Sequence, residues 1–155
     1  MKETKIRDYT ERDYSQTLAI AERLPEWFDK DARERAIPLD LKHQKVFVAE
    51  ENNTIRGFIS LFIAEGRLNI GWLAVDSSMH GKGIGKLLLK KAEIFGKQNG
   101  IEEITTCTLG DSVDYPPYAS TREFYWRNGF EIYQRSKTDN EGCPEEIKIK
   151  KRITV

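Results

Sequence analysis

Apolar and polar residues at the start of the chain follow a strand pattern and then two helical patterns. Residues 3–8 predict a short strand, and residues 10–24 predict a helix with one apolar face. A second short helix is expected over residues 29–36, and Pro38 is expected to end it because proline breaks a helix interior. The capping-box pair and the apolar face of the first helix are, in chain order, Thr10, Asp13, Tyr14, Leu18, Ala21 and Leu24.

Three strand-like runs follow, separated by residues that favour tight turns. The runs cover residues 45–50, 54–64 and 67–75, and they are rich in β-branched and aromatic side chains. Asn52-Asn53 separates the first two, and Glu65-Gly66 separates the second pair. The pattern therefore predicts three consecutive antiparallel strands.

The rest of the chain alternates between helix and strand patterns. Residues 84–98 predict an amphipathic helix that ends at Asn99-Gly100, and residues 101–109 predict a strand reached by a β-α-β crossover. Residues 111–119 are expected to form a loop, followed by a helix over 120–129 and strands over 130–136 and 145–155. The order predicts a single α/β domain over residues 1–155, with a mixed, mostly antiparallel central sheet flanked by helices.

Composition narrows the class of protein. The 155 residues carry 25 Lys and Arg against 25 Asp and Glu, so the zero net charge gives no support for a nucleic-acid partner. Two cysteines and two histidines are too few for a disulfide framework or a zinc cluster, so no metal is expected. The first residues do not resemble a signal peptide and no run is long enough to cross a membrane, which favours a cytoplasmic protein without a membrane partner.

A glycine-rich loop precedes the apolar helix. Residues 79–90, MHGKGIGKLLLK, place Gly81, Gly83 and Gly85 at the expected helix start. A helix N-terminus offers free N–H groups and the positive end of the helix dipole, so it favours a phosphate close to the main chain. The alternative is a turn that only lets the helix pack closely on the sheet.

Two familiar phosphate loops do not match. A Walker A loop needs Ser or Thr after its Gly-Lys pair, and Leu87 stands there. A dinucleotide fingerprint needs G-x-G-x-x-G in a mostly parallel sheet, whereas this loop reads G-x-G-x-G after a strand expected to be antiparallel. A nucleotide-binding or phosphotransfer protein that uses the loop for ATP remains an alternative.

LAVDSSMHGKGIGKLL, followed about forty residues later by FYWRNGF, resembles the GCN5-related N-acetyltransferase (GNAT) family. The acetyl-CoA loop of that family reads [RQ]-x-x-G-x-[GA]; Gly83 and Gly85 match it, and His80 departs from it. The resemblance implies the GNAT fold, no metal, and acetyl transfer from acetyl-CoA to a primary amine of a small molecule, peptide or protein in a ternary complex. It also implies a possible homodimer, because related proteins are often dimers.

The resemblance further implies where acetyl-CoA binds. The pantetheine arm would lie beside the strand Leu73, Ala74 and Val75, and a backbone N–H of this stretch would polarise the thioester carbonyl. Gly71 is compatible with the bulge that separates this strand from the next in the family. The pyrophosphate would bind the main-chain N–H groups of His80, Gly81, Lys82, Gly83, Ile84, Gly85 and Lys86.

Tyr125 occupies the position of the family's general acid, which protonates the departing thiolate. The alternative for Tyr125 is an aromatic core residue. Some family members carry a glutamate base on the central strand, but Asn69 stands at that position here and Glu65 lies further out at a turn. The general base therefore stays unassigned, which leaves open an acyl-CoA-binding module of the same fold without turnover.

Other residues have less specific implications. The family often has an asparagine seven residues before the tyrosine, where this chain has Tyr118, so Thr121 and Arg122 are the nearby polar candidates for cofactor contact. Cys107 is expected to be a buried and inert strand cysteine. Trp27 and Phe28 could form a wall of the acceptor site, and the alternative is that they are two core aromatics. The loop with Asp111, Asp114, Tyr115 and Tyr118 could attract a cationic amine, and the alternative is an ordinary solvated loop.

Overall fold

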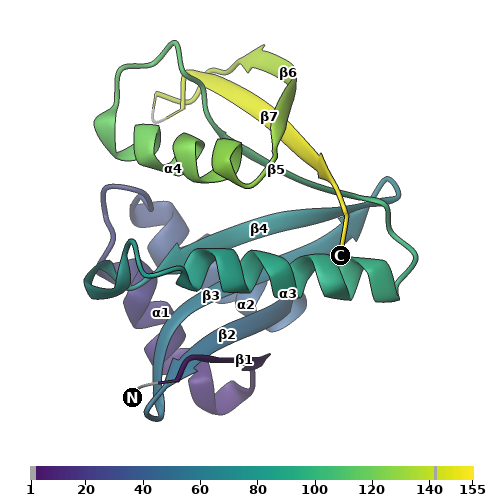
Figure 1. Ribbon diagram of the computed structural model, residues 1–155. Coiled ribbons are helices and arrows are strands. Elements are labelled where there is room, and N and C mark those ends of the chain that lie inside the picture. Colours follow the sequence, from purple (N-terminus) through teal and green to yellow (C-terminus); the bar gives the residue numbers. More distant parts are fainter. Residues whose placement is uncertain (1–2, 142) are drawn as a thin grey trace.

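The computed structural model describes residues 3–141 and 143–155, and it contains a seven-stranded sheet in the order β1-β2-β3-β4-β5-β7-β6 (Figure 1). All neighbouring strands are antiparallel except β4 and β5, so the predicted mixed, mostly antiparallel sheet is confirmed. The strands are β1 (Lys5–Asp8), β2 (Lys45–Glu51), β3 (Thr54–Ala64), β4 (Arg67–Val75), β5 (Glu103–Leu109), β6 (Glu131–Lys137) and β7 (Glu145–Arg152). The α-helices are α1 (Tyr14–Glu22), α2 (Ile37–His43), α3 (Ile84–Gln98) and α4 (Pro116–Arg127).

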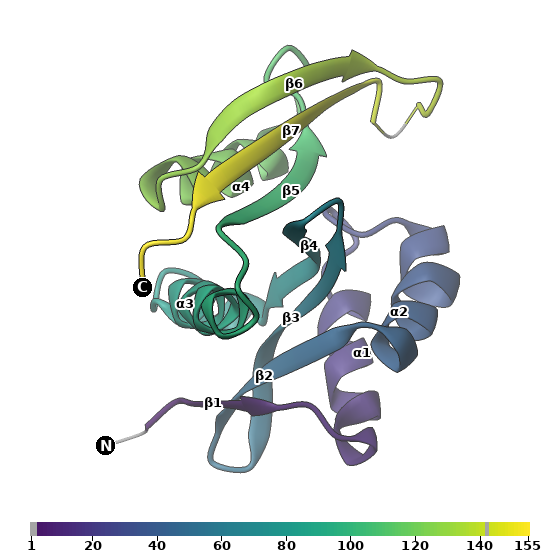
Figure 2. The same cartoon turned by 90° about the vertical axis from the view of Figure 1, so that its right-hand side faces the viewer.

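The helices cover the two faces of the sheet unequally. Helices α1 and α2 lie against one face of β2–β4, α3 lies against the other, and α4 lies beside β5–β7 (Figures 1 and 2). Two apolar cores result, one around α1 and α2 with Ile20, Phe28 and Phe58, and one around α3 and α4 with Leu88 and Tyr125. None of the described helices is long and apolar enough to cross a lipid bilayer.

Both predicted turns form as expected. Asn52 and Asn53 have φ angles of 50° and 61°, and Glu65 and Gly66 have φ angles of 53° and 75°. Two consecutive residues with positive φ make the turn type whose twist matches that of a two-stranded antiparallel hairpin. The parallel β4–β5 pair, joined through α3, likewise confirms the predicted crossover.

The prediction that Pro38 ends the second helix is wrong. The helical backbone passes from a π-helical segment, Ala32–Ala36, directly into α2, and Pro38 lies in the first turn of α2. In the wide turn the Ile37 N–H bonds to the Ala32 carbonyl, five residues back. The wide π-helical turn before Pro38 accommodates the N–H group that proline lacks, so the helix continues to His43.

The same property of proline moves the start of the last helix. Helix α4 begins at Pro116, whereas residues 116–119 were expected to be loop, and Pro116 and Pro117 occupy its first turn. The remaining elements agree with the sequence pattern within a few residues at their ends. Helix α1 ends two residues before Leu24, and β7 ends at Arg152.

A bulge and a divergence shape the centre of the sheet. Trp72 pairs with Ser60 and Ile70 pairs with Leu61, so Gly71 is an extra residue in β4. A Cβ atom on Gly71 would come within 2.3 Å of the Gln44 side-chain oxygen and 2.9 Å of Ser60 Oγ, so a larger residue would require both side chains to shift. Beyond the bulge β4 leaves β5, and the two strands pair only through Leu68–Asn69 and Ile104–Thr105. The sheet is therefore open between β4 and β5.

Candidate active site

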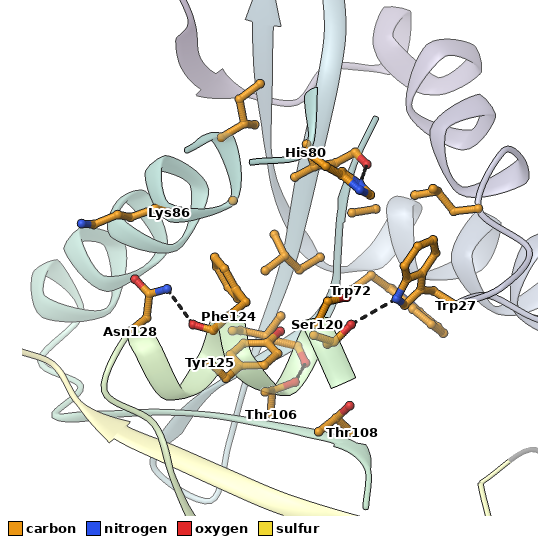
Figure 3. Close-up of a pocket in the computed structure, with 18 of the residues that line it drawn as sticks. Trp27, Trp72, His80, Lys86, Thr106, Thr108, Ser120, Phe124, Tyr125 and Asn128 are labelled. Carbon is orange, nitrogen blue, oxygen red and sulfur yellow. Dashed lines mark hydrogen bonds between the residues drawn. The ribbon is translucent and has the colours of Figure 1, made fainter. Parts of the chain in front are cut away.

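A cavity of about 600 Å³ occupies the opening between β4 and β5 (Figure 3). It is lined from both faces of the sheet. Leu73, Ile84 and Tyr125 belong to the core of α3 and α4, whereas Phe28 and Trp72 belong to the core of α1 and α2. Because the adjacent residues Trp72 and Leu73 point to opposite faces and both line the cavity, the cavity passes through the sheet.

The backbone of β4 presents free hydrogen-bonding groups to this opening. The Trp72 N–H donates to Ser60 Oγ at 2.8 Å, and the Asp76 N–H donates to the Arg56 carbonyl at 2.7 Å, so these residues face β3. Alternate residues of a strand present their N–H and C=O groups to opposite edges. Ala74 therefore faces β3 as well, and Leu73 and Val75 face the gap, which reduces the three predicted backbone positions to two.

The three loop glycines, Gly81, Gly83 and Gly85, have different structural roles. Gly81 and Gly83 have φ angles of 79° and 83°, a backbone conformation that disfavours other residues, and no atom lies within 4 Å of a Cβ built on either. Gly83 is the N-cap of α3, so the N–H groups of the first turn of that helix have no intrahelical partner. The His80 and Lys82 N–H groups instead donate to the Ser77 and Met79 carbonyls, both at 3.3 Å. A Cβ on Gly85 would lie 3.1 Å from the Phe124 ring, so Gly85 lets α4 pack against α3.

Three residues with basic side chains line the cavity. His80, Lys86 and Arg127 all line it, as do Gly81, Ile84 and Gly85, whereas Lys82 does not. His80 Nε2 donates to the Val75 carbonyl at 2.7 Å, so the imidazole holds the loop to the end of β4. The Lys86 ammonium group lies in the first turn of α3, so together with the helix N-terminus it makes this end of the cavity suited to an anion.

Tyr125 is both a core residue and a wall of the cavity. Its side chain is 5% exposed, and its ring centroid lies 5.2 Å from that of Phe124 and 5.1 Å from that of Phe130. Burial raises the pKa of the Tyr125 phenol, and a hydrogen bond with Thr106 acts in the opposite direction. The phenol is therefore protonated and able to donate a hydrogen bond, but it is a weaker acid than an exposed tyrosine.

A set of hydrogen bonds joins the loop after α1 to the start of α4. Trp27 Nε1 donates to the Pro117 carbonyl at 3.0 Å and to Thr121 Oγ1 at 3.1 Å. In return the Tyr118 hydroxyl donates to the Trp27 carbonyl at 2.6 Å, and the Tyr115 hydroxyl donates to the Glu26 carbonyl at 2.7 Å. We call these contacts the α1–α4 clasp. Burial raises the pKa of the Tyr118 phenol to about 12, so that hydroxyl stays protonated.

Two expectations from the sequence are wrong. Arg122 does not line the cavity; it is buried and donates to the Leu109 carbonyl at 3.0 Å, fixing the end of β5 to α4. Cys107 is not buried in the core; its side chain is exposed and lines the cavity. Partial burial and the nearby Glu146 raise the pKa of the Cys107 thiol to about 11, so it is a thiol rather than a thiolate at neutral pH.

The polar loop before α4 has its own partners. Asp111 forms an ion pair with Arg135 at 2.7 Å, which lowers the pKa of its carboxyl group. None of the residues that line the cavity is an aspartate or a glutamate within the described chain. The described residues also contain no cluster of three or more side chains able to hold a metal ion.

Asn69, which stands where the family resemblance implied a glutamate base in some members, is held in the sheet. Its side-chain oxygen accepts from Thr105 Oγ1 at 2.8 Å, and its nitrogen donates to the Arg67 carbonyl at 3.1 Å. Glu65 lies in the β3–β4 turn and does not line the cavity. The sequence pattern also overlooked Trp72 as a lining residue, although strand alternation beside Leu73 could have identified it.

Solved structures with similar folds cover nearly the whole chain. A GNAT-family protein from Desulfovibrio desulfuricans aligns with a TM-score of 0.83 at 20% identity, over 98% of this chain and 100% of that chain. The PaiA N-acetyltransferase of Thermoplasma acidophilum, in complex with coenzyme A, gives 0.75 at 20% identity, over 97% and 99%. The ribosomal-protein-S18-alanine N-acetyltransferase of Escherichia coli gives 0.77 at 14% identity, over 99% and 96%.

Sequence comparison agrees with the fold. No curated protein matches the chain significantly. The family model described as "Acetyltransferase (GNAT) domain" matches residues 42–132, which is more than half of the chain and includes β4, the glycine loop, α3 and α4. The chain therefore belongs to the GNAT family of acetyltransferases.

Proposed function

We propose that residues 1–155 form one N-acetyltransferase domain that transfers the acetyl group of acetyl-CoA to a primary amine by direct attack in a ternary complex. The observation that carries this proposal is the cavity through the open sheet, lined from both faces. Two substrates that enter from opposite faces can meet in the gap between β4 and β5. Such a meeting point supplies the proximity on which direct transfer depends.

Acetyl-CoA suits the α3 side of the cavity. Its pyrophosphate would lie against the main chain of residues 80–86 and accept hydrogen bonds from the N–H groups that start α3, beside Lys86, because the His80 and Lys82 N–H groups already donate to loop carbonyls. Its pantetheine arm would pair with the backbone groups of Leu73 and Val75, which face the gap left by β5. The structural likeness to the coenzyme A complex from Thermoplasma acidophilum supports this placement.

Residues of β4 and α4 would then stabilise the charges that develop during the transfer. The amine nitrogen forms a bond to the thioester carbon, the carbon–sulfur bond breaks, and the electron pair leaves on sulfur. The Leu73 or Val75 N–H is available to stabilise the oxyanion. The hydroxyl of Tyr125, a residue that lines the cavity, would donate to the departing sulfur in place of its hydrogen bond with Thr106. Because no carboxylate lines the cavity, we infer that the amine reacts in its neutral form. After the attack its nitrogen loses one proton to water, and water returns a proton to the Tyr125 oxygen.

Initial-rate kinetics distinguish this reaction from its rivals. With acetyl-CoA and an amine varied together, direct attack gives intersecting double-reciprocal lines, and Cys107→Ala keeps its activity. Parallel lines and an inactive Cys107→Ala variant would show an acyl-cysteine intermediate instead.

A binding protein without turnover is the second candidate. The observation that favours it is the absence of a lining carboxylate base together with the hydrogen-bonded Asn69. Tight acetyl-CoA binding with no thiol release against a broad panel of amines would establish this alternative.

A further inference from the structure

The part of the cavity on the α1/α2 face has flat apolar walls. Leu24 and Phe28 follow α1, and their side chains are 4% and 8% exposed. Trp72 comes from β4, and its ring meets the Phe28 ring edge to face, with 5.8 Å between their centroids. Trp27 adds a fourth apolar side chain at the α1–α4 clasp, on the right of Figure 3. These walls offer aromatic surface against which a flat group can pack.

The part of the cavity on the α1/α2 face lacks the carboxylates that would bind a polycation, among the described residues. The lysine and the arginine that line the cavity are Lys86, which belongs to α3, and Arg127, which is the last residue of α4 and forms an ion pair with Glu123 at 2.9 Å. Asp40 does not line the cavity, because its Oδ2 accepts the Trp72 Nε1–H at 2.8 Å and the tryptophan forms the wall. A second ammonium group entering here would lose its water without gaining a carboxylate, which is unfavourable.

The wall also contains a hydroxyl group without a partner. Thr108 is 8% exposed and lines the cavity. Its Oγ1 is shielded from solvent and makes no hydrogen bond with any described residue. A buried hydroxyl without a partner destabilises a protein, so a ligand that brings one hydrogen-bonding group into this space is favoured.

We propose that the acceptor is a small primary monoamine that carries a flat apolar group, with the group against Phe28 and Trp72 and the amine within reach of Thr108. The proposal rests on the proposed acetyltransferase function. Apolar walls, the missing carboxylate and a single unpaired hydroxyl together match a ligand with one polar group on an apolar body. Diamines, polyamines and peptides fit these walls less well.

Binding to the protein saturated with coenzyme A tests the proposal without requiring turnover. Isothermal titration with 2-phenylethylamine, 1,4-diaminobutane, spermidine and a tripeptide amide compares one aromatic monoamine with three rival classes. We expect 2-phenylethylamine to bind at least tenfold more tightly than each of the others. Equal affinities, or tighter binding of a diamine, polyamine or peptide, would overturn the proposal.

The same amines, supplied with acetyl-CoA, separate this proposal from the proposed function. Acetylation of a diamine or peptide with the higher kcat/KM leaves the acetyltransferase function standing and overturns the aromatic acceptor. Preferred binding of 2-phenylethylamine with no acetylation of any amine supports the ligand class and contradicts the acetyltransferase function.

Two variants test the wall directly. Trp72→Phe keeps an aromatic ring but frees Asp40, so we expect 1,4-diaminobutane to bind several-fold more tightly than to the wild type. Trp72→Phe combined with Asp40→Asn is the matched control and should lose this gain. Unchanged diamine affinity in Trp72→Phe would contradict the role given to charge.

Thr108→Val keeps the shape of the side chain and removes its unpaired hydroxyl. We expect a several-fold weaker affinity for 2-phenylethylamine, unchanged acetyl-CoA affinity and no fall in melting temperature. An unchanged amine affinity would remove Thr108 from the site.

Discussion

Individual residues at the cavity owe their identity to different physical causes, although the sequence presents them as one motif. Gly83 is favoured by its positive φ, while Gly85 is favoured by the Phe124 ring, to which an added Cβ would come within 3.1 Å. Glycine spacing alone cannot separate these causes, because the second depends on a helix about forty residues away. Arg122 and Cys107 were misjudged for the same reason, since their surroundings come from β5, β7 and α4 together.

Tyr125→Phe tests the hydroxyl in the cavity wall. We expect kcat to fall about tenfold to a hundredfold, because the departing thiolate loses its donor, while acetyl-CoA affinity stays nearly unchanged. Steady-state kinetics and calorimetric titration measure the two quantities. Tyr118→Phe is the control, because it also removes a buried hydroxyl, one that bonds to the Trp27 carbonyl. Equal kcat in Tyr125→Phe and the wild type would leave Tyr125 as a core aromatic only.

At the scale of elements, the sequence pattern correctly predicted the two hairpins and the amphipathic helix. It misplaced the helix ends that lie beside prolines. Asn52-Asn53 and Glu65-Gly66 carry their turn geometry locally, so their residue types are sufficient. Pro38 and Pro116 are ambiguous, because proline is compatible both with a break and with the first turn of a helix. Which of the two occurs depends on packing elsewhere in the fold.

An ion pair that joins β1 to the start of α1 gives a pH-dependent stability. Arg7 holds Asp13 through two hydrogen bonds of 2.8 and 2.9 Å, and the Thr10 N–H adds a third at 2.8 Å. The Arg7 bond is the largest cause that lowers the pKa of Asp13 from 3.8 to about 2. Because the carboxylate is favoured in the folded state, its contribution is complete above about pH 4 and is lost as the pH falls toward 2.

Asp13→Asn should therefore lower the free energy of unfolding by about 2 kcal/mol at pH 7. The difference from the wild type should shrink steadily below pH 4. Urea denaturation at several pH values measures it. A difference that does not change between pH 7 and pH 2.5 would show that the ion pair does not act in this way.

At the scale of the whole molecule, the proposed function depends on an opening that only the assembled sheet has. Gly71 hinted at the bulge, and the family resemblance implied that β4 and β5 separate, but the α1–α4 clasp has no counterpart in local sequence. Its partners, Trp27 and Pro117, are 90 residues apart. The walls on the α1/α2 face, which set the proposed acceptor, are likewise a product of tertiary packing.

The most direct test of the account is calorimetric titration of the purified protein with acetyl-CoA, with ATP as the comparison ligand. We expect acetyl-CoA to bind in the micromolar range, equivalent to about −8 kcal/mol, and ATP to bind far more weakly. In Gly83→Val, whose φ of 83° strains a β-branched residue at the start of α3, acetyl-CoA affinity should fall at least tenfold. Absence of acetyl-CoA binding, equal affinity for ATP, or wild-type affinity in Gly83→Val would contradict a cofactor site at the glycine loop.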